Sequence, residues 1–469
     1  MNATIAPEMI AQLQEIVGQS FLFTDEETRK KYGHDETEDY SFPPHVVIKP
    51  RTAQEISKVL ILANQHNIPV IPIGARTGLS GGALSIFGGI GLSMERFNEI
   101  LDIDEKNLQV TVEPGVVTQV LQETVMEKSL FYPPDPSSRG SCFIGGNVAE
   151  NAGGARAVKY GVTKDYVLNL EVVLPTGEII WTGANTLKNS TGYNLTQLMV
   201  GSEGTLGVIT KIVMKLAPYP TQNVLMLVPF YSSYKACEAV SAVFRAGITP
   251  SALEFMERDA IDWTLKFIDG ISIPIKEEIQ AHLLIEVDGN DLDILFAEAE
   301  KISQIMENFE CDEILFADTA DQKNALWKLR RNVAEAVKSN SVYKEEDTVV
   351  PRYELPQLLE GIKTIGNKYG FKSICYGHAG DGNLHVNIIK STMTDEEWKT
   401  EVPKGIREIF ELTVSLKGTL SGEHGIGLVQ KNYMDIAFNE TQLQLMRGIK
   451  NLFDPNGILN PGKIFPDKK

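Results

Sequence analysis

The sequence predicts an α+β protein built from at least two domains. The chain has 469 residues, which at about 100–200 residues per domain corresponds to two to four domains. In its first half, segments with the apolar spacing of amphipathic helices alternate with short strand-like segments. Pro218 and Pro220 mark the boundary that we predict before a second mixture of strands and longer helices over residues 221–428.

Local patterns predict the individual elements. Residues 52–55 form the capping-box pattern Thr-x-x-Glu, and the helix that they open places Ile56, Val59, Leu60 and Ala63 on one face. Apolar or alternating segments predict strands at residues 69–73, 108–112 and 168–174. Further helices are predicted at residues 291–308, 318–338 and 441–452.

Composition and charge exclude several classes of protein. The 62 aspartates and glutamates outnumber the 44 lysines and arginines, and the net charge of −18 argues against nucleic acid as a partner. No apolar stretch approaches the ~18–20 residues that span a bilayer, and residues 1–20 lack the pattern of a secretory signal. The four cysteines form no CxxC pair, which argues against an iron–sulfur cluster or a structural zinc site. We expect a cytoplasmic protein, with peripheral association with the inner membrane left open.

Three glycine-rich segments in the first half indicate a phosphate-bearing ligand. Seven of the eighteen residues from 74 to 91 are glycine, and this run directly follows a predicted strand. Glycines let backbone N–H groups converge on one concave spot that favours phosphate oxygens, although a flexible surface loop has the same composition. Similar runs at residues 145–154 and 201–207 favour one extended ligand with a pyrophosphate. No GxGxxG lies at a strand-to-helix junction, and the P-loop-like residues 457–463 precede Ile464 instead of Ser or Thr.

The same segments resemble the FAD-binding half of the vanillyl-alcohol oxidase/p-cresol methylhydroxylase (PCMH) superfamily, at residues 72–82, 133–138, 145–151 and 201–210. The resemblance covers nearly the whole chain. It is closest to the FAD-linked D-2-hydroxyacid dehydrogenases, which include D-lactate dehydrogenases, the glycolate oxidase FAD subunit and D-2-hydroxyglutarate dehydrogenases. It implies a PCMH-type FAD-binding domain, a substrate or cap domain with an antiparallel sheet, and a C-terminal segment that returns to the FAD domain, at residues 1–217, 218–428 and 429–469.

In the resembled family, the loop 74–82 would wrap the pyrophosphate of FAD. The cofactor-binding residues that the resemblance implies are Pro72, Gly74, Ala75, Arg76, Thr77, Gly78, Ser80, Gly81, Pro134, Asp135, Ser138, Gly145, Gly146, Asn147, Asn151, Glu203, Gly204, Gly207, Ile209 and Asn460. Members with covalent flavin often carry a histidine in the glycine loop, where this chain has Arg76 and Thr77. We therefore expect non-covalent FAD.

Two histidine motifs in the second half indicate a metal site. The first spans residues 376–387 and contains His378 and His385; the second, residues 421–427, contains Glu423 and His424. Two histidines and a carboxylate are the usual ligands of a catalytic divalent metal with open positions, although histidines in polar turns also make ordinary hydrogen bonds. His378, His385 and Glu423 match the metal ligands of the resembled family, which implies zinc, iron or manganese.

A 2-hydroxy acid would suit such a metal, because its carboxylate and α-hydroxyl can chelate one ion. The ion would acidify the hydroxyl, His424 would accept its proton, and flavin N5 would accept the Cα hydride. The resemblance also implies that Arg330 and Lys344 bind the substrate carboxylate and that Asn387 completes the site. Arg330 could instead be a solvated helix charge. Ala334 stands where D-2-hydroxyglutarate enzymes carry a hydroxyl residue, which favours a short monoacid such as D-lactate.

Other functions remain open at this stage. The chain could be a glycolate or D-2-hydroxyglutarate dehydrogenase, the non-catalytic FAD subunit of a larger oxidase, or a metal-free oxidase that uses O₂. We expect a small 2-hydroxy acid as substrate and a separate electron acceptor, which could be a quinone, an electron-transferring flavoprotein or an iron–sulfur subunit. A homodimer is left open, and no nucleic acid partner is expected.

Overall fold

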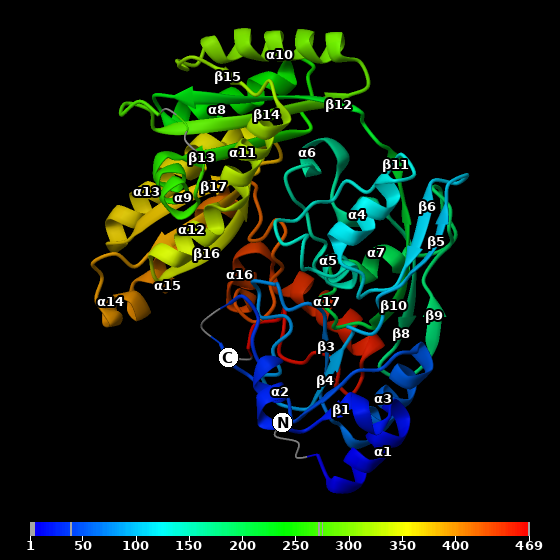
Figure 1. Ribbon diagram of the computed structural model, residues 1–469. Helices are drawn as coiled ribbons and strands as arrows, with labels where there is room; N and C mark the ends of the chain where they lie inside the picture. Colours follow the sequence, from blue (N-terminus) through cyan, green and yellow to red (C-terminus); the bar gives the residue numbers. More distant parts are fainter. Residues whose placement is uncertain (1–4, 38–39, 271–272, 274, 468–469) are drawn as a thin grey trace. The chain divides into compact units, whose positions relative to one another are not determined.

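The computed structural model describes residues 5–37, 40–270, 273 and 275–467 (Figure 1). Its contacts divide the chain into two compact units. Unit 1 comprises Met1–Gly153, Val162–Tyr219 and Glu423–Lys469, and unit 2 comprises Gly154–Gly161 and Pro220–Gly422. The sequence placed the second boundary at residue 428; the structure groups residues 423–428 with unit 1, where the N–H groups of Ile426 and Gly427 donate to Glu203.

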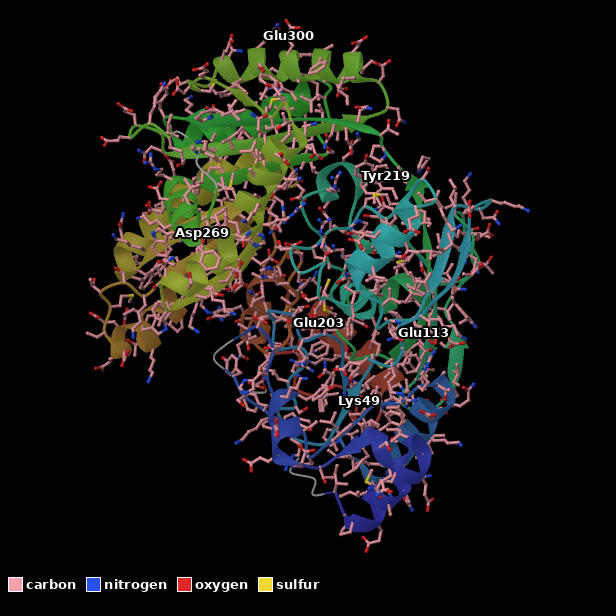
Figure 2. All side chains as sticks on the ribbon, viewed as in Figure 1. Lys49, Glu113, Glu203, Tyr219, Asp269 and Glu300 are labelled. Carbon is pink, nitrogen blue, oxygen red and sulfur yellow. The ribbon has the colours of Figure 1, made fainter. Side chains whose placement is uncertain are left out.

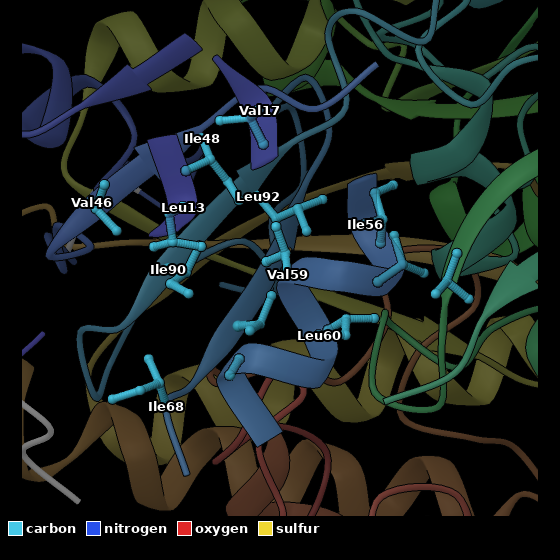
Figure 3. Packing of buried hydrophobic residues seen from close by; sticks show 14 of the residues in the cluster. Leu13, Val17, Val46, Ile48, Ile56, Val59, Leu60, Ile68, Ile90 and Leu92 are labelled. Carbon is cyan, nitrogen blue, oxygen red and sulfur yellow. The ribbon is translucent and has the colours of Figure 1, made fainter. Parts of the chain in front are cut away.

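The first sheet of unit 1 carries the glycine-rich loop. Its strands run in the order β1 (Leu22–Phe23), β2 (Val46–Ile48), β4 (Ile90–Ser93) and β3 (Val70–Ile73), and the last three pair in parallel. Helix α3 (Ala53–His66) begins as predicted, with Thr52 Oγ1 accepting the Glu55 N–H at 3.2 Å. Its apolar face packs into a core that includes Ile56, Val59, Leu60, Val46, Ile48, Ile90 and Leu92 (Figure 3).

The second sheet of unit 1 is antiparallel. Its order is β5 (Ile100–Asp104), β6 (Gln109–Val112), β10 (Val208–Lys215), β8 (Val167–Val173) and β9 (Ile179–Trp181). A two-stranded sheet joins β7 (Leu130–Phe131) to β11 (Ala217–Pro218). The longer helices of the unit are α1 (Pro7–Val17), α2 (Glu26–Lys31), α4 (Thr118–Met126), α5 (Ile144–Glu150), α7 (Leu195–Met199) and α17 (Glu440–Phe453). The strands predicted at 69–73, 108–112 and 168–174 correspond to β3, β6 and β8.

The chain after α17 returns to the first sheet. The N–H of Val70 donates to Ile458 O at 2.8 Å, and the N–H of Asn460 donates to Val70 O at 2.9 Å. The C-terminal segment therefore pairs with β3 at Val70, and it brings Asn460 to Gly82 of the glycine-rich loop.

Unit 2 is built on one antiparallel sheet, as the family resemblance implied, and this sheet has seven strands. The order is β15 (Leu315–Phe316), β12 (Gln222–Phe230), β14 (Ala281–Gly289), β13 (Ala252–Glu257), β17 (Lys372–Gly377), β18 (Asn383–Ile389) and β16 (Tyr343–Val349). One face packs against apolar residues of α9 (Arg258–Phe267), α11 (Ala320–Arg331) and α12 (Val333–Asn340). The mixture of helices and antiparallel strands confirms the α+β prediction.

Further helices complete unit 2. They are α6 (Ala157–Tyr160), α8 (Ser233–Arg245), α10 (Leu292–Glu307), α13 (Leu355–Tyr369), α14 (Asp395–Thr400) and α15 (Val402–Ser415). The helix predicted at 318–338 is instead two helices, because Asn332 leaves the helical path and its side chain donates to Lys328 O at 2.8 Å. No helix within the described ranges is both long enough and apolar enough to cross a membrane.

Candidate functional site

In unit 1, the loop that follows β3 contacts two segments that are distant in sequence. Asn460 Nδ2 donates to Gly82 O at 3.0 Å and to Glu203 O at 2.8 Å. Lys463 Nζ donates to Leu84 O at 2.7 Å and to Asn460 Oδ1 at 3.0 Å. The structure thus brings together the loop 74–82, the turn at Glu203 and the C-terminal segment, all of which carry predicted cofactor residues.

Helix α5 supplies a further predicted segment. The N–H of Gly201 donates to Val148 O at 2.9 Å, and the N–H of Glu203 donates to Ala149 O at 2.9 Å. Close packing accounts for two of the glycines here. A Cβ at Gly145 would come within 2.5 Å of Pro114 Cβ, and a Cβ at Gly207 would come within 2.3 Å of Val172 Cγ1.

The glycine loop also leaves open space and a buried donor without a hydrogen-bond partner among the described residues. A Cβ at Gly78 or Gly146 would meet no atom within 4 Å. Arg76 has a positive φ of 63°, and its guanidinium lies over the Tyr32 ring, 4.4 Å from the centroid. Its Nη1 is buried without a hydrogen-bond partner in the described part of the chain, and Glu95 Oε1 is 3.9 Å away. Open backbone beside a buried cationic donor fits the phosphates of a dinucleotide.

The other predicted cofactor residues lie in the neighbouring elements of unit 1. Asn147 donates from Nδ2 to Thr118 Oγ1 at 2.6 Å, which ties α5 to α4. The carbonyl of Pro134 accepts a hydrogen bond from Gln122 at 2.9 Å. A Cβ at Gly204 would lie 3.4 Å from Pro72 Cγ. These contacts give Asn147 and Pro134 structural roles within the unit.

The residues after Gly422 are held on unit 1. The carboxylate of Glu203 accepts the N–H of Ile426 at 2.9 Å and that of Gly427 at 2.7 Å. Glu203, labelled in Figure 2, is 7% exposed, and burial raises its pKa although these two N–H groups oppose the shift. Two hydrogen bonds therefore hold the loop that contains Glu423 and His424 against the turn that contains Glu203.

A buried charged cluster lies beside this loop. Burial raises the pKa of Glu150 well above its ordinary value, and repulsion from Glu203 and Asp35 adds to the shift. Burial lowers the pKa of Lys463 to about 8, although the same three carboxylates oppose the shift. One lysine therefore compensates three acidic groups that are largely withdrawn from water.

In unit 2, His378 and Arg330 share one carboxylate that the sequence analysis missed. His378 Nδ1 lies 2.9 Å from both oxygens of Glu254, and Arg330 Nη2 lies 2.7 Å from Glu254 Oε2. All three side chains are buried. Burial opposes ionisation of Glu254, but its interactions with His378 and Arg330 outweigh this effect and hold its pKa below the ordinary value. In the sequence, Glu254 is a single glutamate between the apolar residues Leu253 and Phe255, a pattern that does not by itself point to a site.

His385 lies beside His378 on the same sheet. Their ring centroids are 5.4 Å apart and the rings are inclined at 81°. Asp347, which faces His385 in the register of β16 and β18, accepts hydrogen bonds at 2.8 Å from Ser421 Oγ and from the N–H of Gly422. The first residues of the second histidine motif, Ser421 and Gly422, thus end unit 2 beside Asp347, and Glu423 follows Gly422 in the chain.

Asn387 is on the same face as His385, as strand alternation predicts. It is fully buried, and neither its Nδ2 nor its Oδ1 has a hydrogen-bond partner among the residues that the structure describes. The Nε of Arg330 is also buried without such a partner. Unsatisfied buried donors and acceptors are costly, so these atoms fit a polar ligand.

The structure does not bring Lys344 to this site. In the antiparallel register, Lys344 faces Ile388, whereas Glu345 faces Asn387. Directly opposed residues share a face of the sheet and neighbours alternate, so Lys344 lies on the other face. Glu345 takes its place, accepting a hydrogen bond from Tyr376 Oη at 3.3 Å with His385 Nδ1 3.8 Å away.

Family models agree with this arrangement. Residues 44–183 match the FAD binding domain, and residues 219–464 match the C-terminal domain of the FAD linked oxidases. The chain belongs to the FAD-linked oxidase family. It is therefore an FAD-dependent oxidoreductase, and the prediction of FAD as cofactor is confirmed.

Three relatives of this FAD-linked oxidase, matched over nearly their whole length, carry related names. The chain is 39% identical to the D-lactate dehydrogenase of Anaerostipes hadrus, with 98% of each chain covered. It is 38% identical to glycolate oxidase subunit GlcD of Bacillus subtilis (strain 168), covering 98% of this chain and 97% of the relative. It is 32% identical to the D-2-hydroxyglutarate dehydrogenase of Stutzerimonas stutzeri (strain A1501), covering 98% and 99%. These names confirm the predicted branch.

Solved structures confirm the PCMH-type fold of this FAD-linked oxidase. p-Cresol methylhydroxylase matches with a TM-score of 0.77 at 16% identity, covering 98% of this chain and 96% of that one. At this identity the likeness concerns the fold alone.

Proposed function

We propose that this FAD-linked oxidase oxidises a short D-2-hydroxy acid, with D-lactate to pyruvate as the best candidate, and that it needs a divalent metal. The observation that carries the proposal is the group of His378, His385, Asn387 and Arg330 on unit 2. Two imidazoles, an unsatisfied amide and a guanidinium suit a metal ion and a small carboxylate together. The relative named D-lactate dehydrogenase supports the same substrate class.

His378, His385 and Glu423 are the proposed metal ligands. Glu254 holds the Nδ1 of His378, which leaves Nε2 with a lone pair for an ion. Zinc, iron or manganese accepts imidazole nitrogen and carboxylate oxygen, and supplies Lewis acidity toward the substrate hydroxyl. Asp347 fixes the chain at Gly422, one residue before Glu423.

Arg330 and Asn387 are the proposed substrate ligands. A guanidinium can grip a carboxylate at two points, and the free Nε of Arg330 provides one of the donors. Asn387 offers one acceptor and two donors to the same small molecule. Together they hold the Cα–H in one orientation, which lowers the entropic part of the barrier.

His424 is the proposed base that accepts the hydroxyl proton, because an imidazole titrates near neutral pH and follows directly on a proposed ligand. FAD supplies the hydride acceptor when it is bound. The predicted residues of the loop 74–82, helix α5, the turn at Glu203 and Asn460 would hold it. Arg76 and Thr77 stand where covalent members carry histidine, so the FAD is proposed to be non-covalent.

Two residues favour a monocarboxylate. Ala334 offers no hydrogen bond to a distal carboxylate, and it packs against the apolar cluster that includes Trp327 and Tyr376. Glu345 places a negative charge near His385, which would repel a second carboxylate on the substrate. Glycolate remains the second candidate, since the relative GlcD is named a subunit of glycolate oxidase. D-2-Hydroxyglutarate is third on these grounds.

Electrons would leave to a separate acceptor. An electron-transferring flavoprotein, a quinone or an iron–sulfur subunit fits the proposal, and the named subunit among the relatives supports a partner chain. We further propose that the protein is cytoplasmic; cell fractionation distinguishes this location from association with the inner membrane. Light scattering tests whether the chain forms a homodimer.

Anaerobic bleaching of the bound flavin tests the substrate directly. The purified protein is mixed with D-lactate, L-lactate, glycolate and D-2-hydroxyglutarate in turn. We expect D-lactate to reduce the flavin fastest and L-lactate to leave it oxidised. Fastest reduction by D-2-hydroxyglutarate would contradict the arguments from Ala334 and Glu345.

A further inference from the structure

We infer that Glu254 is a shared positioning residue, whose one carboxylate fixes both the imidazole of His378 and the guanidinium of Arg330. Metal binding and substrate binding are then coupled through Glu254, which itself contacts neither the metal ion nor the substrate. The inference rests on the proposed function, in which His378 binds the metal and Arg330 binds the substrate carboxylate. Neither histidine motif nor the arginine segment contains Glu254, which comes from strand β13.

The sheet register places Glu254 against His378. Phe255 pairs with Gly377 and Met256 with Tyr376 between β13 and β17. Continuing this antiparallel register by one residue sets Glu254 opposite His378, and the N–H of Gly380 donates to Leu253 O at 2.9 Å just beyond. The pairing of two central strands therefore places the two side chains next to each other.

The hydrogen bond fixes which ring nitrogen of the neutral His378 imidazole carries the proton. An ionised carboxylate can only accept, so Nδ1 of His378 must carry the proton that it donates to Glu254. In the neutral imidazole, Nε2 then keeps its lone pair, and the orientation of the ring sets the direction in which this lone pair points. A carboxylate that accepts a hydrogen bond from Nδ1 also raises the basicity of Nε2 and makes the imidazole a better metal ligand.

The second contact involves the last turn of α11. Arg330 Nη2 lies 2.7 Å from Glu254 Oε2, one of the two oxygens that His378 also approaches. Glu254 and Arg330 are 1% and 4% exposed. At this burial a carboxylate that loses one partner is left undercompensated, so displacement of either side chain disturbs the other. A single anion thus sets the distance between the proposed metal ligand and the proposed substrate ligand.

A purely structural buried ion pair is the alternative, and unit 2 contains a matched example. Glu286 is also 1% exposed and belongs to the strand paired with β13, where it faces Ala252. Its carboxylate contacts Arg156 at 3.3 Å and accepts from Trp327 Nε1 at 3.0 Å. Glu286→Gln therefore removes a buried charge on the same sheet face without changing a partner of His378 or Arg330.

The test compares Glu254→Gln with Glu286→Gln in the FAD-loaded full chain. Each protein is dialysed against a chelator series, and bound zinc or manganese per chain is measured by mass spectrometry. We expect Glu254→Gln to bind metal about 10–100-fold more weakly, the usual cost of losing such a partner. At saturating metal its KM for the 2-hydroxy acid should also rise, whereas FAD per chain stays unchanged. Glu286→Gln should keep the wild-type metal affinity and KM.

The outcomes separate the inference from the proposed function. Wild-type protein that binds no metal would contradict the proposed function. Wild-type protein with metal, together with Glu254→Gln of equal metal affinity, would overturn the role of Glu254 alone. If Glu254→Gln does not fold, Glu254→Asp keeps the charge but shortens the reach to His378; a folded Glu254→Asp with wild-type metal affinity would overturn the inference, and weakened affinity would support it.

Discussion

Gly427 lies against the backbone of Ser80: a Cβ added at Gly427 would come within 2.2 Å of the Ser80 carbonyl oxygen. That oxygen also accepts the N–H groups of Leu428, at 2.8 Å, and Val429, at 3.1 Å. The loop after the second histidine motif and the glycine-rich loop of the proposed FAD site are therefore packed backbone to backbone. Glycine is required here both by this approach and by a φ of 48°.

Replacing Gly427 by alanine should consequently weaken FAD binding. Gly457→Ala is the matched control, because Gly457 has a φ of 63° but a Cβ there would meet no atom within 4 Å. The free energy of unfolding of the control should fall by only about 1–2 kcal/mol, the cost of placing a non-glycine residue in the left-handed region. Gly427→Ala should lose more stability, measured by thermal unfolding, and should also bind less FAD, measured by the flavin-to-protein absorbance ratio. Equal losses in both variants would show that the contact with Ser80 does not matter.

His424→Ala tests the proposed base. Neither FAD nor metal needs this ring in our account, so both should stay at wild-type content. Turnover should fall by about 10²–10⁴, the usual contribution of a positioned general base. Stopped-flow measurement of flavin reduction gives the rate of the chemical step. A variant that reduces flavin as fast as the wild type would assign the proton to another acceptor.

Glu345→Lys should shift the substrate preference toward dicarboxylates. The change reverses a charge on the sheet face that carries Asn387 and His385. We expect the ratio of kcat/KM for D-2-hydroxyglutarate to that for D-lactate to rise at least about ten-fold, which corresponds to ~1.4 kcal/mol. Glu345→Gln removes the charge without reversing it and should give a smaller rise. An unchanged ratio in both variants would remove Glu345 from the specificity argument.

His282 should make unit 2 less stable in mild acid. It is 1% exposed on β14, and burial lowers its pKa from 6.5 to about 4, with repulsion from Arg258 adding to the shift. Between these values the unfolded chain binds a proton that the folded protein does not, so stability falls as the pH drops through this window, by about 3 kcal/mol in total. Denaturant unfolding of wild type and His282→Leu at pH 7 and pH 5 measures it. The variant should lose less stability than the wild type; equal losses would contradict the assignment.

The sequence predicted most of what local patterns determine. The capping box at Thr52, the alternation in β6 and the glycine segments predicted a helix, a strand and loops close to their actual bounds. Glu254 was missed because its partner His378 is 124 residues away, and only the pairing of β13 with β17 joins them. Lys344 pairs with Ile388 and so lies on the face opposite to Asn387, because the face of a strand residue depends on the register with its partner strand, which local patterns do not determine.

The central claim is that this family member oxidises a D-2-hydroxy acid with FAD and a metal together. The most direct test is anaerobic stopped-flow reduction of the bound flavin by D-lactate and by α-deuterated D-lactate, before and after treatment with a chelator. We predict rapid reduction with a deuterium isotope effect in the metal-loaded protein. The chelated protein should keep its FAD, reduce it at least about 10²-fold more slowly, and recover when zinc or manganese is restored. Reduction at an undiminished rate in fully chelated protein would contradict the account.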